Sequence, residues 1–109
     1  MRYGEKIQDI QIIIDAYKLT FKSSEYSIER LIEYHKKLIA VYVDEYIPGI
    51  FFQIEIILGP LNITENGVEN VKMLAHITFE NDTTYPIHIN NWHWINDEEE
   101  KSNGEEKGS

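Results

Sequence analysis

Three apolar segments that agree on one strand register lie within residues 52–95, FQIEIILGPLNITENGVENVKMLAHITFENDTTYPIHINNWHWI. The first two segments are separated by Asn66-Gly67, a two-residue hairpin signal, because both residue types tolerate the positive φ of a type I′ turn. A turn centred there predicts a β-hairpin with one apolar face. The expected cross-strand pairs on that face are Leu58 with Ala75, Ile56 with Ile77 and Ile54 with Phe79.

A second turn signal, Asn81-Asp82-Thr83, precedes the third apolar segment. A three-residue loop at this point sets Phe79 opposite Tyr85 and Ile77 opposite Ile87. A slip of one residue at either turn would move Ile77 beside polar neighbours, because side chains alternate between the two faces of a strand. The two turns therefore predict a three-stranded antiparallel meander. Its strands are expected at about residues 51–61, 68–80 and 85–95.

The same register predicts which face of the meander is buried. Pro86 cannot donate a ladder hydrogen bond, so the third strand is expected at an edge of the sheet. The apolar side chains on one face of the strands are expected to form the core. They are Ile54, Ile56, Ile77, Phe79 and Ile87.

Two amphipathic helices are predicted before the strands, from apolar residues at spacings of three and four. The first is expected at about residues 5–22. Its apolar face would hold Ile7, Ile10, Ile14, Tyr17 and Phe21.

The second helix is expected to begin after a cap at Ser24 or Ser27 and to end at Pro48-Gly49. Residues 38–43 are β-branched enough for a strand, but no turn residue separates them from the preceding lysines, which favours the helix. His35 falls on the apolar face and is interpreted as a core histidine. The full expected face is Ile28, Leu31, Ile32, His35, Leu38, Ile39 and Tyr42.

These elements predict one α+β domain over residues 1–96, with two N-terminal helices packed on one face of the meander. Residues 97–109 contain no apolar residue and are expected to form a disordered acidic tail. The chain has no cysteine, no apolar run near the roughly 20 residues that span a bilayer, and no signal-peptide pattern at its start. A cytoplasmic location is therefore expected.

The net charge of −9 limits the classes of partner. The acidic tail holds six acids and two lysines, so most of the excess of acids lies in the domain itself. Direct binding to nucleic acid or to an anionic membrane is not expected, because both depend on cationic surfaces. A basic protein partner is compatible with this charge, as is a simple contribution to solubility.

A metal site is considered for the outer face of the meander. The predicted register sets His76 opposite His88, with Ile57 beside His76 and Glu55 diagonal to it. Two imidazoles and a carboxylate are zinc ligands, but polar cross-strand pairs are also common on sheet surfaces. No zinc-binding spacing, phosphate-binding loop or nucleophile motif is present. No metal, cofactor or enzymatic activity is expected.

Trp92 and Trp94 end the third segment and, by alternation, share the face of His88. Two interpretations remain open. A covering helix or a bulge at Asn90-Asn91 would place both indoles in the core. Otherwise they form a partner-binding or homodimer patch, because Trp is enriched at interface hot spots.

Asp44 and Glu45 lie near the predicted C-terminus of the second helix. Carboxylates there oppose the helix dipole, so they mark either an acidic binding site or a solvated helix end.

We therefore expect a small acidic protein-binding protein, of the inhibitor or immunity-protein type, that blocks a basic macromolecule such as a nucleic-acid enzyme. The alternative is a phage or mobile-element assembly protein that forms homodimers or larger oligomers through its sheet edges. A small metal-dependent hydrolase is the third candidate. The residues expected at the partner-binding surface are Asp44, Glu45, His76, His88, Trp92 and Trp94.

Overall fold

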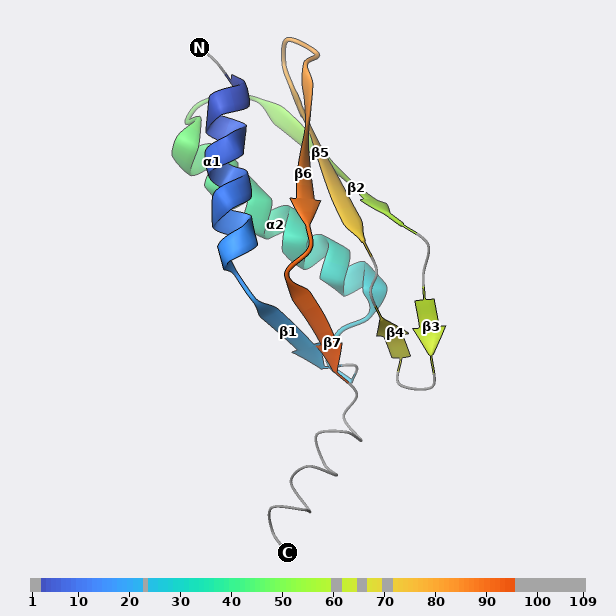
Figure 1. Ribbon diagram of the computed structural model, residues 1–109. Helices are drawn as coiled ribbons and strands as arrows, with labels where there is room; N and C mark the ends of the chain where they lie inside the picture. Colours follow the sequence, from blue (N-terminus) through green and yellow to red (C-terminus); the bar gives the residue numbers. More distant parts are fainter. Residues whose placement is uncertain (1–2, 23, 60–61, 65–66, 70–71, 96–109) are drawn as a thin grey trace, which may run out of the picture.

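A computed structural model describes residues 3–22, 24–59, 62–64, 67–69 and 72–95, with the backbone alone for 62–64, 67–69 and 94. Two helices pack on one face of a three-stranded antiparallel sheet, as Figure 1 shows, which confirms the expected α+β fold. The acidic tail predicted at residues 97–109 lies outside the described residues. None of the helices that the structure describes is long and apolar enough to cross a bilayer.

The helices are α1 (Tyr3–Ala16) and α2 (Ile28–Tyr46). The sheet has the order β2-β5-β6, formed by β2 (Phe52–Leu58), β5 (Met73–Phe79) and β6 (Thr84–Ile89). Two short pairs extend it. They are β3 (Asn62–Thr64) with β4 (Gly67–Glu69), antiparallel, and β1 (Leu19–Lys22) with β7 (Trp92–Ile95), parallel.

The β2–β5 hairpin keeps the predicted faces but not the predicted partners. Ile56 pairs with Ala75 and Ile54 with Ile77, so every expected partner is displaced by two residues. The pairing of Thr64 with Gly67 explains the difference, because it places Gly67 in β4, whereas the prediction placed Gly67 in the turn. The connection between the paired strands therefore comes one residue earlier than expected. A displacement of two residues leaves each side chain on its face, whereas a displacement of one would not.

The β5–β6 turn is displaced in the same way. The amide of Phe79 donates to the carbonyl of Thr83 (3.0 Å), which makes residues 80–82 the three-residue loop. Asp82, the last loop residue, has a φ of 63°, as the left-handed position of such loops requires. Asp is among the few residue types that adopt this conformation readily, so the loop is placed one residue before the predicted one.

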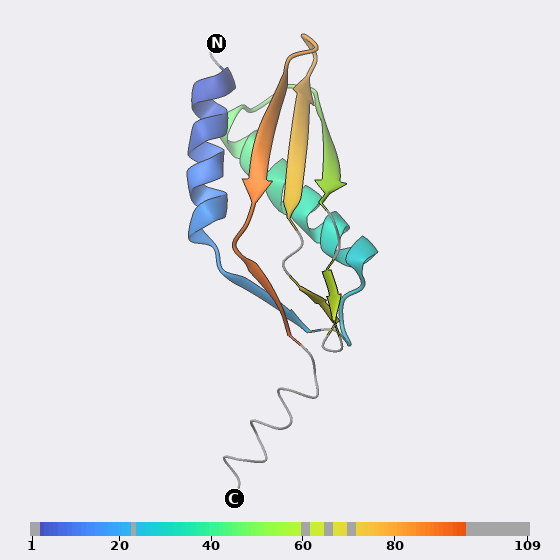
Figure 2. The same cartoon turned by 45° about the vertical axis from the view of Figure 1, so that its right-hand side comes forward.

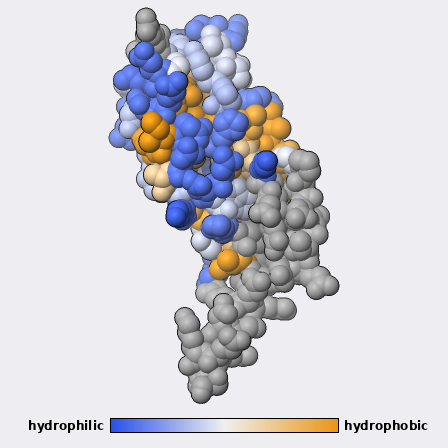
Figure 3. All heavy atoms as spheres, in the orientation of Figure 1, coloured by the Kyte–Doolittle hydropathy of each residue, from blue (hydrophilic) through white to orange (hydrophobic). Residues whose placement is uncertain are grey.

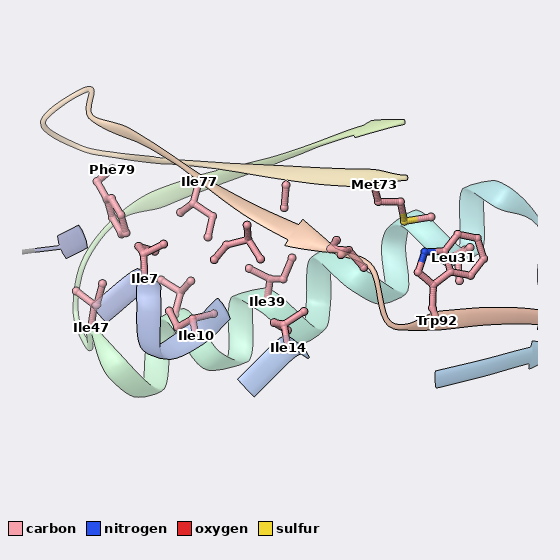
Figure 4. Packing of buried hydrophobic residues seen from close by; sticks show 14 of the residues in the cluster. Ile7, Ile10, Ile14, Leu31, Ile39, Ile47, Met73, Ile77, Phe79 and Trp92 are labelled. Atoms are coloured by element: carbon pink, nitrogen blue, oxygen red, sulfur yellow. The ribbon is translucent and has the colours of Figure 1, made fainter. Parts of the chain in front are cut away.

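The core lies between the sheet and the two helices (Figure 4). Ile77, Phe79 and Ile87 are buried as predicted, whereas Ile54 and Ile56 are only half-buried because β2 is an edge strand. The helices contribute buried residues along one stripe each. These are Ile7, Ile10 and Ile14 from α1, and Leu31, His35, Ile39 and Val43 from α2.

The predicted start of α2 is confirmed, because the hydroxyl of Ser27 accepts a hydrogen bond from the amide of Arg30 (3.3 Å). The helical assignment of residues 38–43 is also confirmed. The first helix is shorter than predicted, because α1 ends at Ala16 and residues 19–22 form β1. The amide of Leu19 donates to the carbonyl of Asn91 (3.1 Å), so a distant segment supplies the partner that makes this stretch a strand.

Candidate functional site

The outer face of the sheet does not bring His76 and His88 together as predicted. His76 lies opposite Glu55 on one side and Pro86 on the other, while His88 lies opposite Leu74. The two-residue displacement at each turn is the cause of this correction. Within the described part of the chain, no group of three potential metal ligands occurs.

The outer face is nevertheless open to solvent, since α2 crosses behind the sheet and α1 lies beside β6 (Figure 2). It mixes polar and apolar side chains. The hydroxyls of Thr78 and Thr84 are hydrogen-bonded across the strands (3.0 Å), and Ile57 remains 39% exposed.

Trp92 is a core residue. Its side chain is only 8% exposed, and its ring lies 6.5 Å from that of Phe21 and 6.4 Å from that of His35, centroid to centroid. The chain leaves the sheet at Asn90-Asn91 to form β7, and this break turns Trp92 inward. Of the two interpretations, the structure therefore supports the core placement for Trp92, through a break at Asn90-Asn91, and Trp92 does not share an exposed face with His88. The side chain of Trp94 lies outside the described part of the structure.

His35 is buried beside Trp92, as the core interpretation predicts. It is 2% exposed and lies between the rings of Phe21 (5.8 Å) and Tyr34 (5.6 Å). Its Nε2 atom has no hydrogen-bond partner among the described residues. Burial lowers the pKa of His35 to about 4, so the ring is neutral at pH 7 and is enclosed away from any substrate.

Asp44 and Glu45 are exposed in the last turn of α2, and that turn contains no basic residue. Val41 lies one turn earlier on the same side of the helix and is 60% exposed. Phe51, just beyond the helix, is 67% exposed. The structure thus places exposed Val41 beside the predicted acidic pair on α2. The sequence signal for Val41 was its position opposite the buried stripe of α2.

A shallow hollow of about 520 Å³ lies on the first half of α2, lined by Tyr26, Glu29, Arg30, Glu33, Tyr34 and Lys37. Two of its charged side chains have local partners. Arg30 donates to the carbonyl of Glu25 (2.7 Å) and lies over the ring of Tyr26, and Glu33 is 3.9 Å from the ammonium of Lys36.

The only other strongly perturbed group among the described residues is Tyr42. Its hydroxyl is hydrogen-bonded to that of Tyr17, and this bond, with a smaller effect of burial, raises the pKa of Tyr42 to about 12. The phenol stays protonated at pH 7, so it does not act as a base.

The chain matches no protein-family model, no curated protein and no solved structure.

Proposed function

We propose that this chain is a small acidic protein that binds and blocks a basic macromolecular partner, such as a nucleic-acid enzyme. The observation that carries the proposal is the exposed acidic pair Asp44 and Glu45, which lies beside exposed Val41 in a chain of net charge −9. Complementary charge steers the approach of two proteins, and apolar contact then slows their separation.

The roles of the surface residues follow from their exposure. Asp44 and Glu45 act on the rate of association. Val41 and Phe51 provide the apolar contact that the buried Trp92 does not offer. His76 and His88 face solvent on the sheet and contribute to a second, polar part of the surface. The proposal assigns no reaction to any of these side chains.

The test uses charge reversal with a matched control on the same helix. Asp44→Lys combined with Glu45→Lys is compared with Glu29→Lys combined with Glu33→Lys, which changes the net charge equally. Tagged proteins capture partners from a lysate of the native host, and association rates are then measured with the purified partner. We expect a basic partner, with association slowed about tenfold by the Asp44/Glu45 variant at low salt and less at high salt.

Two results would contradict the proposal. One is capture of the same proteins at the same rates by both double variants. The other is a specific partner that is itself acidic, because charge steering would then oppose the encounter.

Assembly through sheet edges remains a second candidate function, because one edge of the sheet is free, as described below. Light scattering decides between the two. A monomer at micromolar concentration supports the inhibitor proposal, and a defined oligomer supports assembly.

A further inference from the structure

The β6 edge of the sheet is closed by the chain itself. The side-chain amide of Gln11 in α1 donates to the carbonyl of His88 (2.9 Å) and accepts from the amide of His88 (2.7 Å). These two bonds are those that a neighbouring strand would make at this position. Pro86, two residues earlier on the same edge, has no N–H to offer. No further strand can therefore pair regularly with β6.

The β2 edge is open, in contrast to the β6 edge. The alternation of hydrogen bonds in an antiparallel ladder shows which of its backbone groups face outward. The amide of Gly59, just beyond β2, donates to the carbonyl of Lys72 (2.7 Å). The odd-numbered residues of β2 therefore turn their N–H and C=O groups toward β5. The even-numbered residues must then turn theirs away from the sheet. None of these outward groups is hydrogen-bonded to any residue that the structure describes. They belong to Phe52, Ile54, Ile56 and Leu58.

The side chains along this edge are incompletely covered as well. In the central strand β5, every residue on the helix side is buried, whereas the corresponding residues of β2 are all half-buried. Figure 3 shows hydrophobic surface where β2 runs in Figure 1. A strand added here would therefore satisfy free backbone groups and cover apolar surface at the same time.

The edge also lacks the usual protection. β2 contains no proline and no lysine, the residues that most often block pairing at a sheet edge. Its one charged residue is Glu55, at the middle of the strand, with its side chain exposed on the outer face.

We propose that β2 binds an extended segment of the basic partner as a fourth strand of the sheet. This inference rests on the proposed function and names its binding mode. The segment would place apolar side chains beside those of Ile54 and Ile56 and a lysine or arginine opposite Glu55.

The charge of Glu55 selects this occupant over a second copy of the chain. Antiparallel pairing of two β2 strands over their full length would set Glu55 directly against Glu55 of the other copy. Like charges at directly opposed positions are destabilising, and each copy also carries a net charge of −9. A basic residue at the same position forms a favourable cross-strand pair instead.

The probe is a synthetic peptide of the same length as β2, seven residues, with blocked ends and the sequence Val-Thr-Val-Lys-Val-Thr-Val. Its valines fall beside the apolar row and its lysine opposite Glu55. We expect binding that shifts the amide resonances of the outward-facing residues of β2 most strongly. The same peptide N-methylated at its valines cannot donate to β2, and we expect its affinity to fall at least about tenfold.

Variants of the protein test the same geometry. Ile54→Pro removes an outward N–H without breaking the β2–β5 ladder, and Ile54→Ala removes similar apolar area while keeping the N–H. We expect at least about tenfold weaker peptide binding for the proline variant than for the alanine variant, at matched thermal midpoints. Glu55→Lys should reverse the preference, so that a peptide with glutamate in place of lysine binds better than the original.

The inference is overturned if the N-methylated peptide binds equally well, if the resonance shifts map away from β2, or if neither peptide binds. It is also overturned if the unliganded protein is a dimer that Ile54→Pro converts to a monomer, since a second copy would then occupy the edge. Reversal of Asp44 and Glu45 tests the proposed function separately. If reversing Asp44 and Glu45 leaves the association rate unchanged while the peptide still binds β2, only the steering role of this acidic pair is contradicted.

Discussion

At the scale of single residues, His35 is the one polar side chain among the buried residues that the structure describes. It lies where β1, α2 and β7 meet, in ring contact with Phe21 and Trp92. A neutral imidazole fits this apolar environment, whereas a charged one would lose its hydration without gaining a partner at Nε2. The fold therefore favours the deprotonated ring.

This preference predicts a loss of stability in acid. The pKa of His35 is lowered from 6.5 to about 4, so between these values the unfolded chain binds the proton and the folded chain does not. The free energy of unfolding should fall by about 3 kcal/mol between pH 7 and pH 4 on account of this group. Urea unfolding at both pH values, compared with His35→Leu, measures the effect. An equal pH dependence in the variant would show that other groups are responsible.

The turn residue Asp82 supports a second prediction at this scale. Its φ of 63° is accessible to Asp but costly for a β-branched residue. Asp82→Val should lower the free energy of unfolding by about 1–2 kcal/mol, and Asp82→Gly should change it by less than about 0.5 kcal/mol. Chemical denaturation of both variants checks this. Equal stability of the valine and glycine variants would rule out the left-handed conformation at this position.

At the scale of elements, one side-chain amide makes two hydrogen bonds between α1 and β6. Gln11→Ala removes both hydrogen bonds to the N–H and C=O of His88, and because water can reach these groups we expect a cost of about 0.5–1.5 kcal/mol in unfolding free energy. Gln8→Ala, on the exposed side of α1, is the matched control and should be nearly neutral. If both variants lowered the unfolding free energy by a similar amount, the cause would be a change in the helix and not the loss of the hydrogen bonds to β6.

The parallel pair β1–β7 supports the next prediction, since it is held to α2 by Phe21. This side chain is 3% exposed and packs edge-on against Tyr26 (4.9 Å) and Tyr34 (5.3 Å), centroid to centroid. Phe21→Ala should therefore cost about 3–5 kcal/mol. Ile12→Ala, at a position that is 66% exposed, should cost less than about 0.5 kcal/mol. Thermal or denaturant unfolding of both variants would show whether β1 is an integral part of the core.

At the scale of the whole molecule, we expect the acidic residues after Asn96 to contribute to the net charge but little to the stability of the fold. The residues after Asn96 include six acids and two lysines but no apolar residue. Removing them should shift the thermal midpoint by no more than a few degrees, because the removed residues have no apolar surface to bury. Calorimetry of the full chain and of a chain ending at Asn96 makes the comparison. A large drop would mean that the acidic residues stabilise the domain.

The sequence alone determined the features that depend on local chemistry. Alternation in strands has a period of two, so the faces of Ile77 and Phe79 were predicted correctly even though both turns were placed one residue late. A serine cap at residue 24 or 27, which the structure places at Ser27, and the position of Asp44 and Glu45 near the end of the helix likewise follow from short-range pattern. None of these features requires knowledge of a distant residue.

Tertiary structure decided the features that depend on a partner far along the chain. Residues 19–22 continue the helical spacing, yet they form a strand because β7 pairs with them. Trp92 alternates onto the outer face in sequence, yet it is buried because the break at Asn90-Asn91 carries it under α2. Pro86 already weakens the β6 edge in the sequence, but the closure of that edge at His88 arises only when α1 places Gln11 against β6. The physical reason is the same in each case, since hydrogen bonds and burial between distant segments outweigh small local preferences.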